Sequence, residues 1–242
     1  MASQVEYYQN LVIQNALPLN ERVVEAFYHC PRHFYVRRYR PAGHSEWIDV
    51  TTDTRKDHLA QIYEDKPLML YEEKPFVSTL SQPSFVLRIL DMLQIEPGNK
   101  IFELGTGSGW NAALMAYLTG PEGKVITSEI IPEMADRARA SLIEQGVSNV
   151  KVITGDGFEG AAQLGPYDRI IFTAGSKEFP EKLFAQLKEK GMMVFVRRQT
   201  QDYDSLELIR KKDGKQEKLF SSPCAFVAVI RQTESSPIEK EI

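Results

Sequence analysis

The sequence predicts an α/β fold with a doubly wound, mostly parallel sheet, antiparallel strands at its C-terminal end and a small helical cap at its N-terminal end. Three observations support this prediction. Strand-like and helix-like runs alternate between residues 100 and 196, which is typical of a parallel sheet with helices on both faces. A glycine-rich turn joins the first of these strands to its helix. Two further strand-like runs bracket a turn at 212–215, as in an antiparallel hairpin. Together these features describe a Rossmann-like arrangement.

Composition and charge exclude several classes of protein. The chain has 242 residues and a net charge of −4, so it has no general attraction for nucleic acid or anionic membranes. Its longest apolar runs are about seven residues, well short of the roughly 20 that span a bilayer, and the N-terminus does not resemble a signal peptide. The two cysteines form no disulfide framework or zinc module, and the histidines have no metal-ligand spacing. We therefore expect a cytoplasmic monomer without a metal, a membrane partner or a nucleic-acid partner.

Residues 1–75 are expected to form the helical cap. Apolar residues recur at helical spacing in 5–15 and 19–30, which predicts two amphipathic helices. The stretch 37–65 is charged and has no clean period. We therefore expect an exposed insertion at about 38–62, with a short helix near its end.

Residues 76–231 are expected to form the α/β core, and 232–242 a polar tail. Pro83 stands before a run whose apolar residues line one face of a helix at 84–93. The core is then expected to alternate between strands at 100–104, 124–128, 150–154, 167–173 and 192–196 and helices at 110–119, 132–145 and 178–188. Antiparallel strands at 205–211 and 224–230 are expected to complete the sheet.

The first strand of the core runs into a glycine-rich loop that ends at a helix. Gly105, Gly107 and Gly109 permit positive φ and a close approach to a ligand, and the helix N-terminus offers free N–H groups. A dinucleotide-binding loop is similar, but it places its third glycine three residues after the second, and a P-loop carries a lysine. The acid before the loop, Glu103, suits a cationic or amine-bearing ligand better than a pyrophosphate.

Two more acids follow the next strands of the core. Glu129 ends the second strand, where a carboxylate can accept hydrogen bonds from both ribose hydroxyls. Asp156 follows the third strand, placed for the exocyclic amine of an adenine, and Phe158 offers a stacking face. Three acids and a glycine loop at the ends of successive strands indicate S-adenosylmethionine, which combines an amine, a ribose, an adenine and a sulfonium. The alternative is that these acids only cap helices near the strand ends.

Six segments carry motifs that are shared with one known family. They are 21–27 (ERVVEAF), 30–36 (CPRHFYV), 78–83 (STLSQP), 102–110 (FELGTGSGW), 155–157 (GDG) and 167–174 (YDRIIFTA). The second is similar to a Val-Pro-Arg-x-x-Phe-Val pattern, and the third to a Gln-Thr-Ile-Ser-Gln/Ala-Pro signature. On these residues the chain resembles the protein-L-isoaspartate O-methyltransferase family over roughly 5–36 and 64–196, and more weakly as far as 230.

The resemblance implies methyl transfer from S-adenosylmethionine to the α-carboxylate of isoaspartyl residues in damaged proteins, as a step of protein repair. It identifies Ser81 as the active-site serine, flanked by Thr79 and Gln82. Since a carboxylate with a pKa of about 4 is ionised at neutral pH, its methylation needs orientation and proximity more than a strong base. A serine hydroxyl can orient the carboxylate by donating a hydrogen bond. The alternative is that Ser81 caps the helix that begins near Pro83.

The resemblance and the loop together give a set of expected site residues. Those expected at the catalytic centre are Thr79 and Ser81. Those expected to bind the cofactor are Thr79, Ser81, Gln82, Glu103, Gly105, Thr106, Gly107, Ser108, Gly109, Glu129, Ile130, Asp156, Gly157, Phe158 and Thr173. The expected partners are S-adenosylmethionine as cofactor and an isoaspartyl-containing protein or peptide as substrate.

Four positions are expected to depart from the family pattern near the substrate. Ser78 takes the place of the first residue of the signature, a Gln. Arg197 and Arg198 take the place of a Pro-Val-Gly turn, and Ala228 that of a proline. Adjacent arginines can grip a carboxylate or a phosphate, although a solvated strand end is an equal interpretation. The alternatives are therefore a related methyltransferase that acts on another peptide or small molecule, and a cofactor-binding adaptor with little activity.

Overall fold

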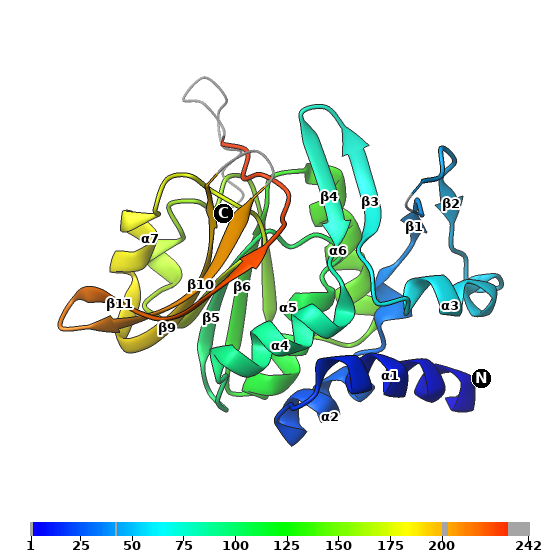
Figure 1. Ribbon diagram of the computed structural model, residues 1–242, viewed down its shortest axis with the longest axis horizontal. Helices are drawn as coiled ribbons and strands as arrows, with labels where there is room; N and C mark the ends of the chain where they lie inside the picture. The colour runs from blue at the N-terminus through cyan, green and yellow to red at the C-terminus, as the bar shows by residue number, and fades with distance from the viewer. Residues whose placement is uncertain (1, 42, 200–202, 232–242) are drawn as a thin grey trace.

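The structure, a computed structural model, describes residues 2–41, 43–199 and 203–231 (Figure 1). Its central sheet has seven described strands in the order β11-β10-β9-β8-β5-β6-β7. Their bounds are β5 Lys100–Leu104, β6 Lys124–Glu129, β7 Val150–Thr154, β8 Tyr167–Phe172, β9 Leu187–Arg198, β10 Asp204–Lys212 and β11 Lys215–Cys224. Strands β5 to β9 pair in parallel, whereas β10 and β11 are antiparallel. The predicted fold class is therefore confirmed.

Helices cover both faces of this sheet because its strands are apolar on both sides. One face carries α4 (Pro83–Leu93), α5 (Trp110–Thr119) and α6 (Pro132–Glu144), with α1 (Ala2–Ala16) and α2 (Glu21–His29) packed against α4 and α5. The other face carries the short α7 (Glu181–Ala185) and the 3-10 turn η3 (Ala162–Leu164). Ile101 of β5 joins the first hydrophobic cluster and Phe102 the second, as the alternation of side chains along a strand requires.

Between α2 and α4 the chain forms short elements and one hairpin. The elements are η1 Arg32–Tyr35, β1 Arg38–Tyr39, β2 Ile48–Asp49, η2 Arg55–His58 and α3 Leu59–Ile62. The last of them is the short helix predicted near the end of the insertion. Strands β3 (Leu68–Glu73) and β4 (Phe76–Leu80) then form an antiparallel hairpin that the sequence did not predict. Strand β4 leads almost directly into α4 (Figure 1), so residues 78–81 lie at this junction.

The helix and the strand that follow β8 differ from their predicted bounds. Helix α7 covers only part of the predicted 178–188. Strand β9 is longer than the predicted 192–196, because Leu187 already pairs with Tyr167 of β8. The residues between Leu187 and the apolar run at 192–196 are polar, so the hydrophobic pattern does not indicate that the strand begins at Leu187.

The strand predicted at 224–230 is wrong. Strand β10 pairs with 215–224 instead, through a tight turn at Asp213 and Gly214. Strand β11 lies at the edge of the sheet and most of its side chains are exposed, so it has no hydrophobic pattern to reveal it. The apolar residues 226–230 line a cavity, which explains why they are apolar without forming a ladder.

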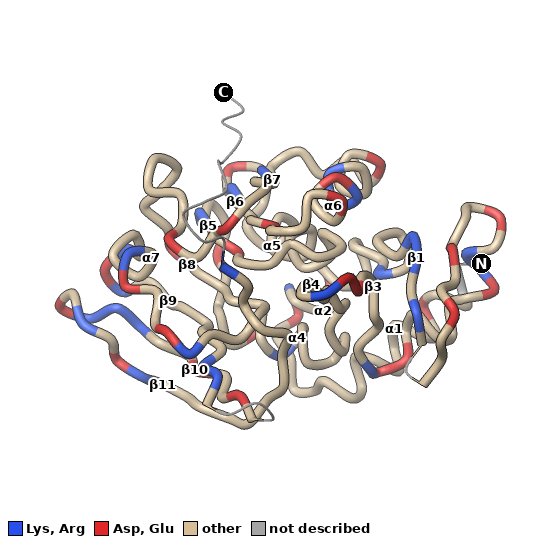
Figure 2. Tube along the Cα trace, turned by 90° about the horizontal axis from the view of Figure 1, so that it is seen from above, with Lys and Arg blue, Asp and Glu red and all other residues tan. Residues whose placement is uncertain are grey.

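Among the described residues, acidic and basic residues do not gather on one side of the molecule (Figure 2). Acidic and basic residues are interspersed around the trace in Figure 2. In the described part of the chain, no helix has both the length and the apolar character that crossing a membrane requires. The same residues contain no cluster of His, Cys, Asp and Glu side chains that would hold a metal ion.

The cap helices and the sheet share one hydrophobic cluster, so we propose that they unfold as one unit. Phe27 of α2 is fully buried, and its ring meets those of Trp110 and Tyr63 edge-on at 6.0 and 6.2 Å. Phe27→Ala is expected to lower the free energy of unfolding by about 3 to 5 kcal/mol in a single transition, measured by urea denaturation with circular dichroism and tryptophan fluorescence. Two transitions, of which only one shifts, would contradict a shared core.

Candidate active site

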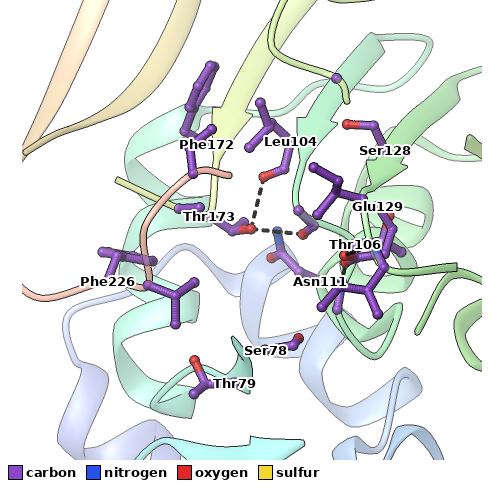
Figure 3. A pocket seen from close by; sticks show the side chains of 18 of the residues that line it. Ser78, Thr79, Leu104, Thr106, Asn111, Ser128, Glu129, Phe172, Thr173 and Phe226 are labelled. Atoms are coloured by element: carbon purple, nitrogen blue, oxygen red, sulfur yellow. Dashed lines mark hydrogen bonds between the residues drawn. The ribbon is translucent and has the colours of Figure 1, made fainter. Parts of the chain in front are cut away.

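A cavity lies at the carboxyl ends of β5, β6, β7 and β8, where the strand order reverses at β5 (Figure 3). Open α/β sheets place their ligand sites at such a reversal. Most of the lining residues belong to the segments 76–81, 104–108, 128–131, 155–157, 171–174 and 226–230. Four of these segments follow parallel strands, whereas 76–81 and 226–230 close the cavity from outside the sheet.

The glycine loop after β5 has a backbone that only glycine adopts easily. Gly105, Gly107 and Gly109 have φ of 96°, 54° and 85°, all in the left-handed region. A Cβ on Gly105 would lie 2.2 Å from Oγ1 of Thr173, the residue that follows β8. That hydroxyl lies 2.9 Å from the carbonyl oxygen of Leu104 and 2.8 Å from that of Gly105 (Figure 3). Thr173 therefore joins the loop to the neighbouring strand.

Glu129, the last residue of β6, lines the cavity and fixes the loop. Its two carboxylate oxygens accept hydrogen bonds from the backbone N–H groups of Gly107 at 2.8 Å and Ile131 at 3.1 Å. The side chain is only 5% exposed. Burial raises the pKa of Glu129, and the backbone N–H donors oppose this by stabilising the carboxylate.

Glu103 does not face the ligand space directly. It is fully buried, and its carboxylate oxygens accept hydrogen bonds from Nδ2 of Asn111 and Oγ1 of Thr127, both at 2.6 Å. Asn111 belongs to the first turn of α5 and does line the cavity (Figure 3). The prediction that Glu103 itself contacts a ligand amine is therefore corrected: Glu103 orients Asn111, and Asn111 faces the cavity.

Of the three predicted site residues in the loop after β7, two line the cavity and one does not. Asp156 and Gly157 line the cavity, and Asp156 accepts hydrogen bonds from the N–H of Phe158 at 2.9 Å and from Nε of Arg231 at 2.8 Å. Phe158 is only 4% exposed and packs edge-on against Phe172 at 6.1 Å. The Arg231 guanidinium lies 4.0 Å from the centre of the Phe158 ring. The ring is thus enclosed by protein rather than presented to a ligand, which corrects its predicted role as a stacking face.

Thr79 and Ser81 line the side of the cavity opposite the glycine loop. Figure 3 shows Ser78 and Thr79 below the loop, with Phe226 at one side. The N-cap of α4 is Gln82, and its side chain accepts no hydrogen bond from a backbone N–H of the helix. The capping interpretation of Ser81 is therefore wrong.

Gln82 has its side chain outside the lining of the cavity. Its Nε2 donates to Asp65 at 3.1 Å and to Oγ of Ser84 at 3.2 Å. Asp65 in turn accepts from the N–H of Ser84 at 3.0 Å, and so it provides the cap that α4 lacks. The structure thus gives Gln82 a place in the capping network of α4.

Residues 226–230, here called the C-terminal strap, form the remaining wall. Asp204 accepts the N–H of Phe226 at 3.0 Å, and Nη2 of Arg198 donates to the Phe226 carbonyl at 2.7 Å. Further along the strap, Ala228 forms a bridge with Gly175 in the loop after β8. The strap therefore lies against the sheet without extending it.

The two arginines suggested as anion ligands are paired within the protein. Arg198 contacts the Asp204 carboxylate at 3.1 Å, and Arg197 contacts the Glu207 carboxylate at 3.1 Å. Arg197 also lies over the ring of Phe195, at 5.1 Å. Both acids are almost completely buried, so these ion pairs hold β9 to β10 and the strap.

The structure brings most of the predicted site residues together. Lining the cavity are Thr79, Ser81, Gly105, Thr106, Gly107, Ser108, Glu129, Ile130, Asp156, Gly157 and Thr173. Gln82, Glu103, Gly109 and Phe158 lie behind them. Sequence reasoning missed Asn111, Ile89 of α4 and the strap, which also line the cavity. The apolar run 224–230 was a signal for the strap, but it was interpreted as a strand.

A family model described as protein-L-isoaspartate(D-aspartate) O-methyltransferase matches residues 8–234. The chain belongs to the protein-L-isoaspartate O-methyltransferase family. As a member of this family, it is a methyltransferase that depends on S-adenosylmethionine. Two relatives named protein-L-isoaspartate O-methyltransferase, from Ignicoccus hospitalis and Pyrococcus horikoshii, are 37% and 36% identical to it. The alignments cover 94% and 87% of this chain and 97% and 86% of the relatives.

Solved structures give the same fold. A protein-L-isoaspartate O-methyltransferase structure is 26% identical with a TM-score of 0.79 and matches 93% of this chain. This chain spans 65% of the chain in that structure. A putative protein-L-isoaspartate O-methyltransferase from Plasmodium falciparum, solved in complex with S-adenosyl-L-homocysteine, is 20% identical with a TM-score of 0.72 and supports the fold alone. That match covers 94% of this chain and 98% of the Plasmodium chain.

Glu103 should make the stability of the protein depend on pH. Burial raises its pKa from 4.5 to about 7, so between these values the folded state holds a proton that the unfolded state has lost. Stability therefore falls as pH rises through this window, by up to about 3 to 4 kcal/mol at roughly 1.4 kcal/mol per pKa unit. Glu103→Gln should remove this slope, measured as the difference between the wild-type and variant unfolding free energies from pH 4.5 to 8. Parallel profiles for the two proteins would contradict the assignment.

Proposed function

We propose that this protein transfers the methyl group of S-adenosylmethionine to the carboxylate of L-isoaspartyl residues in damaged proteins or peptides. The observation that carries the proposal is that the glycine loop and the hydroxyl-bearing segment with Thr79 and Ser81 line one cavity in a chain of this family. The relatives at 36–37% identity carry the name of this activity.

The polar groups of the cavity fit this cofactor. Glu129 and Asp156 are the charged residues among the described lining residues, and both are acids, so the site suits a cation. Oδ1 of Asn111 is buried and has no hydrogen-bond partner among the described residues. Since its Nδ2 is held by Glu103, that oxygen is left to accept a hydrogen bond from an amine. Glu129, at the end of β6, takes the position that receives ribose hydroxyls in such sheets.

The role of the chain's own residues is to bind and to orient. The cofactor, when bound, supplies an electrophilic methyl group. An isoaspartyl carboxylate with a pKa of about 4 is ionised at neutral pH, so no residue has to remove a proton from it. The hydroxyls of Ser81 and Thr79 donate hydrogen bonds that hold one carboxylate oxygen, leaving the other to react. Phe226 and Ile89 give the cavity apolar walls that exclude water. Methyl transfer is accelerated because the carboxylate oxygen and the methyl group are held close together.

The two arginines that suggested another anionic substrate do not support that alternative in the structure. Arg197 and Arg198 are the residues that suggested a different carboxylate or a phosphate. Both are engaged with Glu207 and Asp204, and neither lines the cavity. We therefore propose the isoaspartyl carboxylate alone as the acceptor.

A peptide assay tests the proposed function and the role of Ser81. The wild-type protein should methylate an isoaspartyl peptide and leave the matched aspartyl peptide unchanged, as measured by mass spectrometry. Ser81→Ala should lower kcat about 10-fold or more, because one hydrogen bond to a charged group is lost, while the affinity for S-adenosylhomocysteine stays the same. The absence of transfer to the isoaspartyl peptide would overturn the proposed function. Equal losses of kcat and of affinity in Ser81→Ala would overturn the assigned role of Ser81.

Gly107→Val should abolish cofactor binding. Position 107 has positive φ, and a Cβ there would lie 3.7 Å from Oγ of Ser78. Both residues line the cavity, so a valine side chain would occupy part of it. Gly98→Val is a matched control, because Gly98 also has positive φ but is exposed and has nothing within 4 Å of its Cβ position. Titration calorimetry with S-adenosylhomocysteine should show binding to the control and none to Gly107→Val. Unchanged affinity in Gly107→Val would mean that the loop is not the cofactor site.

A further inference from the structure

Arg32 is a fully buried arginine behind the segment that carries Thr79 and Ser81. Its guanidinium donates three hydrogen bonds, all to main-chain carbonyl oxygens: Nε to Ile62 at 2.8 Å, Nη1 to Ser81 at 2.7 Å and Nη2 to Leu80 at 3.4 Å. Two of these carbonyls belong to neighbouring residues. The planar fork of an arginine donates to such a pair from two nitrogens at a fixed spacing, whereas a lysine ammonium donates all of its hydrogen bonds from one nitrogen.

Burying this cation is costly. Burial lowers the pKa of Arg32 to about 9, which the nearby Tyr63 and Asp65 partly oppose, and the side chain still carries its charge at neutral pH. A buried charge has to be compensated by hydrogen bonds or partners. Here the compensation comes from backbone carbonyls, so the charge is stable only if residues 80 and 81 keep this conformation. Any change in the conformation of residues 80 and 81 would therefore leave the buried charge of Arg32 without part of its hydrogen bonding.

Asp65 holds the same segment from its other end. Its carboxylate accepts from the N–H of Ser84 at 3.0 Å, from Oγ of Ser84 at 2.8 Å and from Nε2 of Gln82 at 3.1 Å. The carbonyls of 80 and 81 are therefore fixed by a cation, and the N–H of 84 by an anion. Between these two attachments Ser81 lines the cavity.

The turn that carries Arg32 also touches the opposite wall. The Arg32 guanidinium lies 4.8 Å from the centre of the Trp110 ring, and the Trp110 indole N–H donates to the carbonyl of Cys30 at 2.9 Å. Trp110 is the first residue of α5, directly after the glycine loop. Residues 30–32 thus contact both the hydroxyl-bearing segment and the helix that follows the loop, which fixes the spacing between the two walls.

We propose that Arg32 and Asp65 are positioning residues that hold Thr79 and Ser81 at the place where the acceptor carboxylate binds. The inference rests on the proposed function, because it assigns the hydroxyls of that segment to the acceptor. Neither residue touches the substrate. Their effect on catalysis arises because small displacements of reacting groups reduce rates steeply.

The test compares Arg32→Met, Arg32→Lys and Asp65→Ala with a matched control, Arg169→Met. Arg169 also binds main-chain carbonyls of the α4 region through its guanidinium, those of Leu93 and Gln94, but at the end of α4 away from the cavity. Arg32→Met keeps an apolar side chain against Trp110. Three quantities are measured for each protein: kcat and KM with an isoaspartyl peptide, affinity for S-adenosylhomocysteine by calorimetry, and hydrogen exchange of residues 79–86 by mass spectrometry.

We expect Arg32→Met and Asp65→Ala to lower kcat about 10- to 100-fold, with affinity for S-adenosylhomocysteine within about three-fold of wild type. Exchange at 79–86 should accelerate in both variants. Arg32→Lys should resemble Arg32→Met despite its charge, because one nitrogen cannot take the places of the three that donate to Ile62, Leu80 and Ser81. Arg169→Met should leave kcat and exchange at 79–86 unchanged.

Three results would overturn the proposal. They are wild-type kcat in Asp65→Ala and Arg32→Met, wild-type exchange at 79–86 in both, or a loss of cofactor affinity as large as the loss of kcat. If Arg32→Met does not fold, Asp65→Ala decides, because Asp65 is only partly buried and its removal leaves the Arg32 hydrogen bonds in place. If the wild-type protein does not methylate the peptide, the proposed function fails. The exchange data then still decide whether the two residues hold the segment.

Discussion

The reversal of strand order at β5 is the constraint on which the site depends. Because β5 lies between β6 and β8, the connections that follow these strands leave toward opposite faces, and a crevice opens at their carboxyl ends. Parallel strands end on one edge, so the glycine loop, Glu129, Asp156 and Thr173 meet there although up to 68 residues separate two that touch. The cofactor half of the cavity therefore follows from strand order and from residues placed directly after strands.

The other half of the cavity is not built by the sheet. Residues 76–81 precede the central sheet in the chain and the C-terminal strap follows it, and charged side chains bonded to main-chain groups hold both. Arg32 binds the carbonyls of 80 and 81, and Arg198 with Asp204 binds the N–H and carbonyl of Phe226. In both places a charge fixes main-chain groups at or just beyond the end of a strand, because Leu80 is the last residue of β4 and the strap follows β11. The two walls therefore differ in how they are held: one by the central sheet, the other by the β3–β4 hairpin and by individual side chains.

The sequence predicted the elements whose burial leaves a strong periodic signal. The bounds of β5, β7 and α5 match their predicted ranges, and the acids that follow β6 and β7 lie in the cavity as expected. The apolar character of a residue did not indicate whether its side chain lies in the core, in a sheet or against the cavity. Residues 226–230 line the cavity instead of a ladder, and Phe158 packs in the core instead of against a ligand. Asp65 lies in a segment without a period and caps a helix 19 residues later, a pairing that only the folded chain brings about.

We propose above all that cofactor and acceptor meet between the glycine loop and the segment 79–81. A crystal structure of the protein with S-adenosylhomocysteine and an isoaspartyl peptide tests it most directly. We predict the ribose at Glu129, the amine at Oδ1 of Asn111, and the isoaspartyl carboxylate within hydrogen-bond distance of the Ser81 or Thr79 hydroxyl, close to the sulfur. A complex in which the peptide carboxylate binds elsewhere, or in which the sulfur faces away from 79–81, would contradict it.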